Sequence, residues 1–132
     1  MERNHFLIRA LVADDDVVSG KFVSAALSTM NCEVSEVSNG TAALACLREQ
    51  QFDLCILDWE MPEVSGLEVC ESVRAGNVLH RPYLILLSSN YGADFVSRAE
   101  NAGADEYMTK PVDPENLRKR VLSLKAALCP SL

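Results

Sequence analysis

Short apolar runs alternate along the chain with longer segments in which apolar residues recur every three or four positions. The runs predict five strands, at residues 9–13, 32–37, 53–58, 83–87 and 104–108. The periodic segments predict five helices, at residues 18–30, 41–48, 65–76, 95–102 and 114–128. This strict alternation predicts an α/β fold, a doubly wound parallel sheet with helices on both faces and right-handed crossovers.

Local signals place several of the helices. Ser65 with Glu68 three residues later predicts a capping box, and Gly103 ends the fourth helix. We expect the buried face of the first helix to consist of residues at helical spacing, namely Val18, Phe22, Ala25, Ala26 and Met30. In the last helix, which starts at Pro114 after an Asp113 cap, the apolar stripe is Leu117, Val121, Leu124 and Leu128.

The composition is that of one folded domain spanning residues 1–132. Of the 132 residues, 48% are hydrophobic and 23% are charged. This hydrophobic content excludes a disordered chain. No apolar run approaches the ~20 residues of a membrane span, so no membrane association is expected. Because only four residues follow the last predicted helix, we expect no output domain after it.

The net charge and the cysteines exclude further classes of protein. The formal net charge of −7 argues against direct nucleic-acid binding, which needs a basic face. The number of cysteines is odd, and no two follow a Cys-x-x-Cys spacing; they are Cys32, Cys46, Cys55, Cys70 and Cys129. We interpret them as free thiols of a cytoplasmic protein rather than as a metal or redox site.

Polar residues follow four of the five predicted strands. They are Asp14, Asp15 and Asp16 after the first, Asp58 after the third, Ser88 after the fourth and Lys110 after the fifth. Ligands of open α/β sheets bind at the carboxyl ends of the strands. Each residue alone is an ordinary cap or turn residue, but together they predict one site.

The acidic residues predict a divalent cation. Several carboxylates that lie close together repel each other, and one Lys cannot neutralise them. Mg²⁺ prefers carboxylate, carbonyl and water oxygens, and Mn²⁺ is a substitute. We expect Asp15 and Asp58 as direct ligands, Asp14 as a ligand through water, and the backbone carbonyl of Glu60 to complete the set.

With such an ion bound, Asp58 becomes a nucleophile toward phosphorus and the product is an aspartyl phosphate. The phosphoryl transition state spreads charge over three oxygens, which must be neutralised. The ion would take one oxygen, Lys110 a second, and the Ser88 hydroxyl with the backbone of Ser89 the third.

These motifs resemble the receiver domain of two-component response regulators, and the resemblance covers essentially the whole chain. It rests on Ala13-Asp14-Asp15, Leu57-Asp58-Trp59-Glu60-Met61-Pro62 with Gly66, Ser88, Gly103-Ala104-Asp105-Glu106-Tyr107 and Lys110-Pro111. It implies a flavodoxin-like sheet of order 2-1-3-4-5, a cis bond before Pro111 and Mg²⁺ dependence. It also implies that Asp58 is phosphorylated from a phosphohistidine, on a sensor histidine kinase or a histidine phosphotransfer protein. Such a protein is a phosphorelay phosphoprotein that catalyses only its own phosphorylation and dephosphorylation.

The resemblance also implies a switch. Phosphorylation would draw the Ser88 hydroxyl inward and let Tyr107 turn, which reshapes the surface of the fourth helix, fifth strand and fifth helix. A homodimer through that surface, pairing Glu106 with Arg120, is one expectation. Glu60 is a departure from the family pattern. We expect it to reach toward Lys110 or the ion, and expect Glu60 and Asn90 to tune the phosphoryl lifetime.

Three other interpretations remain at this point. Asp58-Trp59-Glu60 loosely matches the Asp-x-Asp of haloacid dehalogenase phosphatases, although the order of motifs is reversed and there is no room for a cap domain. A flavodoxin needs a loop of amides for phosphate where this chain has three Asp. A degenerate receiver that only binds partners would not need the complete acidic set. The sequence identifies neither the kinase, the input signal nor the downstream target.

Overall fold

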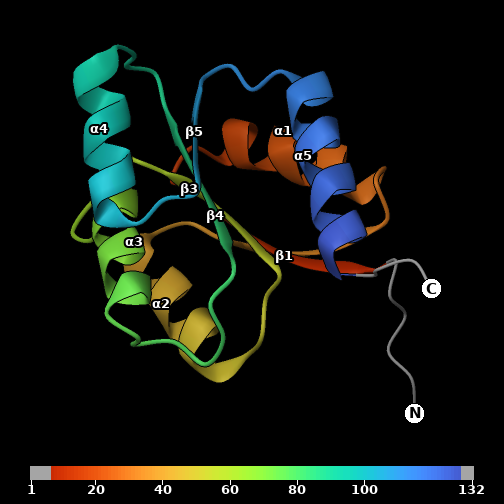
Figure 1. Ribbon diagram of the computed structural model, residues 1–132, viewed down its shortest axis with the longest axis horizontal. Helices are drawn as coiled ribbons and strands as arrows, with labels where there is room; N and C mark the ends of the chain where they lie inside the picture. Colours follow the sequence, from red (N-terminus) through yellow and green to blue (C-terminus); the bar gives the residue numbers. More distant parts are fainter. Residues whose placement is uncertain (1–6, 129–132) are drawn as a thin grey trace.

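The strands and helices of the computed structural model, which describes residues 7–128, alternate without exception (Figure 1). The strands are β1 (Ile8–Ala13), β2 (Cys32–Val37), β3 (Leu54–Asp58), β4 (Tyr83–Ser88) and β5 (Glu106–Thr109). The helices are α1 (Val17–Ser28), α2 (Gly40–Glu49), α3 (Gly66–Arg74), α4 (Ala93–Ala102) and α5 (Pro114–Leu128). All neighbouring strands pair in parallel in the order β2-β1-β3-β4-β5, which confirms the predicted fold.

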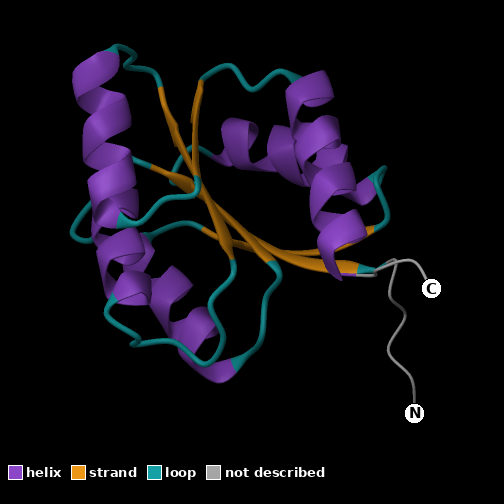
Figure 2. Ribbon diagram, in the orientation of Figure 1, coloured by secondary structure: helices purple, strands orange, loops and turns teal. Residues whose placement is uncertain are grey.

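Helices cover both faces of the sheet (Figure 2). Helices α1 and α5 lie on one face, and α2, α3 and α4 on the other. The central strand β3 is buried along its whole length because alternate side chains enter the two cores. Leu54 and Ile56 pack in the core under α1 and α5, while Cys55 and Leu57 pack in the core under the other three helices.

The loop between β3 and α3 is fixed at its far end. The Ser65 hydroxyl accepts the amide of Glu68 at 3.1 Å, and the Glu68 carboxylate accepts the amide of Ser65 at 2.9 Å, so the predicted capping box is present. Gly66 approaches the Asp58 carbonyl so closely that a Cβ there would lie 2.3 Å from its oxygen. This loop therefore holds Asp58 against the start of α3.

The predicted buried face of α1 is wrong at Val18, Phe22 and Ala25, whereas Ala26 and Met30 pack against the core. Val18 is 77% exposed and Phe22 is 49% exposed, and Ala25 also faces solvent, while Ala26 and Met30 are only half-buried. The buried residues of α1 are instead Gly20, Val23, Ser24 and Leu27. The small residues Gly20 and Ser24 thus share the buried face with Val23 and Leu27, whereas Val18 and Phe22 stay at the surface.

Two smaller expectations also need correction. The fifth strand begins at Glu106 rather than at residue 104, because the Asp105 side chain accepts the amide of Leu84 at 2.7 Å and holds a turn there. Leu128, at the end of the predicted stripe of α5, is 40% exposed, whereas Leu117 and Val121 are buried as expected.

The described cysteines are free thiols, as the sequence predicts. Cys32, Cys55 and Cys70 are buried and Cys46 is half-buried. Cys129 lies outside the described residues. No helix within residues 7–128 is long and apolar enough to cross a membrane.

Candidate functional site

The parallel sheet brings the polar strand ends to one edge. Asp14 follows β1, Asp58 ends β3, Ser88 ends β4 and Lys110 follows β5. Strands β1, β3, β4 and β5 are consecutive in the sheet, so these four ends are neighbours in space although 96 residues separate Asp14 from Lys110. The backbone amide of Lys110 donates to the Ser88 carbonyl at 2.8 Å, which ties the last two ends together.

Three carboxylates form a cluster at this edge. One oxygen each of Asp14, Asp15 and Asp58 lies within 4.8 Å of the other two. Asp14 and Asp58 are buried, and Asp15 is exposed. Asp16 is not part of this group, because its side chain caps α1 by accepting the amide of Val18 at 3.1 Å.

Lys110 is the ammonium that contacts the cluster. Its Nζ lies 3.0 Å from Asp14 Oδ2 and 3.2 Å from Asp58 Oδ1. Burial alone would lower the pKa of Lys110, but hydrogen bonds and charge from Asp14 and Asp58 outweigh it, so the pKa is raised. Lys110 therefore stays charged. The peptide bond between Lys110 and Pro111 is cis, as the family resemblance implied.

The charge of the cluster remains uncompensated. Burial first, and the charge of Asp14 second, raise the pKa of Asp58 from 3.8 to about 7, against the lowering effect of Lys110. A single ammonium is thus insufficient for these carboxylates. Hard oxygen donors with an excess of negative charge fit Mg²⁺, which is held by carboxylates and water. The residues present therefore match the predicted metal site in chemistry.

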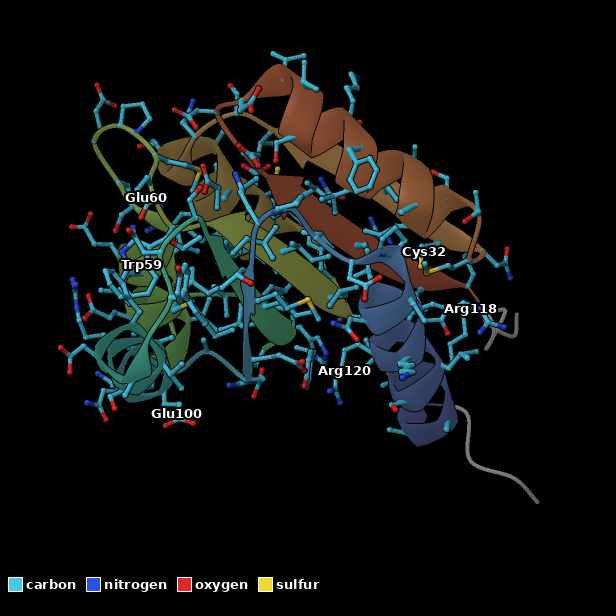
Figure 3. All side chains as sticks on the ribbon, turned by 90° about the horizontal axis from the view of Figure 1, so that it is seen from above. Cys32, Trp59, Glu60, Glu100, Arg118 and Arg120 are labelled. Atoms are coloured by element: carbon cyan, nitrogen blue, oxygen red, sulfur yellow. The ribbon has the colours of Figure 1, made fainter. Side chains whose placement is uncertain are left out.

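Ser88 belongs to a hydrogen-bond network beside the carboxylates. Its side chain is fully buried, and its hydroxyl donates to Glu60 Oε2 at 3.1 Å. The Asn90 backbone amide donates to Ser88 Oγ at 3.1 Å, and Asn90 Nδ2 donates to Glu60 Oε2 at 3.3 Å. Figure 3 shows Glu60 at the edge of the molecule, next to Trp59.

The expectation that Glu60 reaches Lys110 is therefore wrong in this structure. The Lys110 ammonium is held by Asp14 and Asp58, and the Glu60 carboxylate turns to the Ser88 hydroxyl and the Asn90 amide instead.

Tyr107 extends this network to β5. Its hydroxyl donates to the Asn90 carbonyl, and its ring packs edge-on against Trp59 with centroids 5.9 Å apart. Trp59 also packs edge-on against Phe95 at 5.5 Å, and the Arg98 guanidinium lies 5.0 Å above the Trp59 ring. Sequence reasoning missed both the link from Tyr107 to Asn90 and the contribution of Arg98.

The pair predicted for a dimer contact forms within one chain. Arg120 Nη2 donates to Glu106 Oε2 at 3.1 Å, and the Tyr83 hydroxyl donates to Glu106 Oε1 at 3.1 Å. Glu106 and Arg120 thus already pair with each other within one chain.

Fold and site together define a doubly wound α/β domain with three carboxylates and one ammonium at the carboxyl edge of its sheet. The family model of the response regulator receiver domain matches residues 10–122. The chain therefore belongs to the response regulator receiver domain family.

Named relatives and solved structures agree with this family. The chain is 37% identical over 117 residues to the response regulator protein PmrA of Pseudomonas aeruginosa, covering 89% of this chain and 52% of PmrA. The receiver domain of the Francisella response regulator 1452 is 26% identical with a TM-score of 0.84, covering 91% of this chain and 98% of that one. The BeF3-activated DrrB receiver domain is 31% identical with a TM-score of 0.77, covering 89% and 97%.

The family places the chain in two-component phosphorelay signalling, in which response regulators receive phosphoryl groups from histidine kinases. Receiver domains bind Mg²⁺ in an acidic pocket, and the cluster of three carboxylates here matches that pocket. Nothing in these comparisons supports a haloacid dehalogenase type of phosphatase. The chain spans about half the length of the curated relatives it matches.

Proposed function

We propose that this receiver accepts a phosphoryl group on Asp58 and loses it again by hydrolysis, catalysing no other reaction. The observation that carries this proposal is the placement of Asp58. It is a buried carboxylate among Asp14 and Asp15, within 3.2 Å of the Lys110 ammonium. Such a carboxylate is held in position for in-line attack on phosphorus once its charge is balanced.

The ligands of Mg²⁺ would be Asp15 and Asp58, the backbone carbonyl of Glu60, and Asp14 through water. When bound, the ion neutralises charge on the carboxylates and on the phosphoryl oxygens. Mn²⁺ accepts the same oxygen ligands and is a second ion to test. The raised pKa of Asp58 supports this assignment, because burial and, second, the charge of Asp14 disfavour its ionised form and Lys110 alone does not offset them.

Three groups would bind the phosphoryl oxygens from the protein side. The Lys110 ammonium would turn from the carboxylates to one phosphoryl oxygen. It already lies 3.2 Å from Asp58 Oδ1, so a phosphoryl group on Asp58 would be within its reach. The Ser88 hydroxyl and the Ser89 backbone would bind another. Charge-assisted contacts of this kind stabilise the developing charge of phosphoryl transfer.

The signal would leave the site through Ser88 and Tyr107. Tyr107 contacts Asn90 in the loop after β4, and the Asn90 amide donates to Ser88 Oγ, so a change in the hydrogen bonds of Ser88 would reach the surface formed by α4, β5 and α5. That surface is the proposed output, with a second copy of the chain as one candidate partner. Glu60 and Asn90 border the phosphoryl position and would tune its lifetime.

The phosphodonor would dock on the exposed apolar side of α1. Val18 and Phe22 line an open groove with Pro111 and Val112, and Lys110 and Ser89 form the side of the groove next to the site. A phosphohistidine must pass this side of the groove to reach Asp58. We therefore infer that the occupant is a helix of the sensor kinase or of a histidine phosphotransfer protein, which presents apolar side chains beside its histidine.

We infer a cytoplasmic location, and no direct binding to nucleic acid, from the cysteines and the net charge. Four described cysteines are free thiols, as is usual in the cytoplasm. A net charge of −7 disfavours direct nucleic-acid binding by this chain.

Intact mass spectrometry tests the proposed function. The chain is incubated with Mg²⁺ and acetyl phosphate, and one added phosphoryl group is expected. Asp58→Asn should gain none, whereas Asp16→Asn, which keeps the α1 cap and lies in the same acidic run, should gain one. Equal labelling of the wild type and Asp58→Asn would overturn the assignment of Asp58.

A further inference from the structure

The hydroxyl of Ser88 is committed to Glu60. Ser88 Oγ is 3.1 Å from Glu60 Oε2 and 3.4 Å from Glu60 Oε1, and a carboxylate only accepts hydrogen bonds. The acceptor side of the same oxygen receives the backbone amide of Asn90 at 3.1 Å. A hydroxyl carries a single proton, so Ser88 has no further proton to donate while Glu60 holds it.

We propose that Glu60 and the phosphoryl group on Asp58 compete for the one Ser88 proton, so that Glu60 is a positioning residue that holds the unphosphorylated state. This rests on the proposed function, in which Ser88 donates to a phosphoryl oxygen. The two acceptors exclude each other because the proton cannot be shared and because both acceptors are anions. Phosphorylation must therefore displace the Glu60 carboxylate.

The structure favours displacement of Glu60 over displacement of Ser88. Ser88 is fully buried at the end of β4 and its carbonyl accepts the Lys110 amide, whereas Glu60 is exposed and its carboxylate can turn into water. Displacement of the Glu60 carboxylate also affects Asn90 and, through it, Tyr107. Departure of Glu60 also removes one of the two acceptors of Asn90 Nδ2, the other being Ser88 Oγ at 3.4 Å, and the carbonyl of Asn90 accepts the Tyr107 hydroxyl. The competition thus reaches the residue proposed as the output switch.

Binding of BeF3⁻ with Mg²⁺, followed by Trp59 fluorescence, measures the competition. Glu60→Ala removes the competing acceptor and should bind BeF3⁻ about tenfold more tightly, the size expected for a hydrogen bond to a charged group. Glu60→Gln keeps an uncharged acceptor and should fall between Glu60→Ala and the wild type. Glu63→Gln removes an exposed carboxylate from the same loop and should leave the affinity unchanged.

The decisive comparison uses the Ser88→Ala background. With no hydroxyl to compete for, Glu60→Ala should change the BeF3⁻ affinity less than about twofold, because coupled residues are non-additive. An equal gain in both backgrounds would mean simple repulsion between anions and would overturn the proposal. No gain from Glu60→Ala in the wild-type background would also overturn it.

A measurement without metal or phosphoryl analogue checks the contact itself. Glu60→Ala and Ser88→Ala should each shift the NMR signals of the Asn90 side-chain amide and of the Tyr107 ring, while Glu63→Gln should not. Unchanged signals would overturn the proposal even if the chain is phosphorylated. Failure of the wild type to take up either BeF3⁻ or a phosphoryl group would instead overturn the proposed function, and this proposal with it.

Discussion

The carboxylate cluster and the Ser88 network lie side by side at one edge of the sheet but depend on different physics. In the cluster, Asp14, Asp58 and Lys110 are charges brought together by neighbouring strand ends. In the network, hydrogen bonds join Glu60, in the loop after β3, to Ser88 at the end of β4 and to Asn90 just after it. We propose that the cluster supplies the chemistry and that the network, in which Glu60 and Asn90 are exposed, relays its outcome.

Removal of the ammonium should have the largest effect. Lys110→Ala takes away the protein cation nearest Asp58, and loss of a group that stabilises transition-state charge costs about 100–1,000-fold in rate. Stopped-flow phosphorylation with a small phosphodonor measures this rate. Lys21→Ala, which breaks a surface pair with Glu36, is the matched control and should not change it. A decrease below about threefold for Lys110→Ala would show that the cluster does not depend on its cation.

The stability of the metal-free chain should fall as the pH rises from about 4 to about 7. The pKa of the Asp58 carboxyl rises from its ordinary value of 3.8 to about 7 on folding, so over this window the folded chain holds a proton that the unfolded chain has lost. Full ionisation should lower the free energy of unfolding by about 2–4 kcal/mol. Urea denaturation across pH measures it, and Asp58→Asn should flatten this part of the profile. A wild-type profile as flat as that of the variant would contradict the uncompensated charge.

A substitution at Phe22 on α1 distinguishes docking of the phosphodonor protein from the chemistry at Asp58. It is 49% exposed, so Phe22→Ser should change the free energy of unfolding by less than about 0.5 kcal/mol. Phosphotransfer from a histidine phosphotransfer protein should slow by about tenfold, since loss of an interface anchor costs more than about 1 kcal/mol. Phosphorylation by acetyl phosphate should be unchanged. Equal slowing with both donors would place Phe22 in the site rather than in the docking surface.

The smallest effect should come from the far end of the network. Tyr107→Phe removes the hydroxyl that donates to the Asn90 carbonyl and keeps the ring against Trp59. A lost hydrogen bond costs about 1 kcal/mol, which thermal denaturation detects. The rate of Asp58 phosphorylation should not change. A slowed rate would show that cluster and network are not separable as described.

The sequence predicts the cluster well because its signal is residue type. Asp58 stands directly after an apolar run and Lys110 directly after the fifth strand, and a parallel sheet places such residues together whatever their side-chain rotamers are. The fold follows from the same alternation of apolar runs and helical segments.

The network and the face of α1 were less predictable. Whether Glu60 turns to Lys110 or to Ser88 depends on rotamers and on which donors are already occupied, and neither is visible in a list of residues. On α1, the count of apolar residues favoured Val18 and Phe22, but the buried face consists of Gly20, Val23, Ser24 and Leu27. Apolar residues that stay exposed, such as Val18 and Phe22, mislead a prediction from periodicity.

A crystal structure of the chain grown with Mg²⁺ and BeF3⁻ tests most directly whether Asp58 is the phosphoacceptor. We expect beryllium attached to a carboxylate oxygen of Asp58, Lys110 and Ser88 on its fluorines, and Mg²⁺ held by Asp15 and Asp58. Beryllium on a different side chain, or Mg²⁺ bound without Asp58, would contradict that assignment.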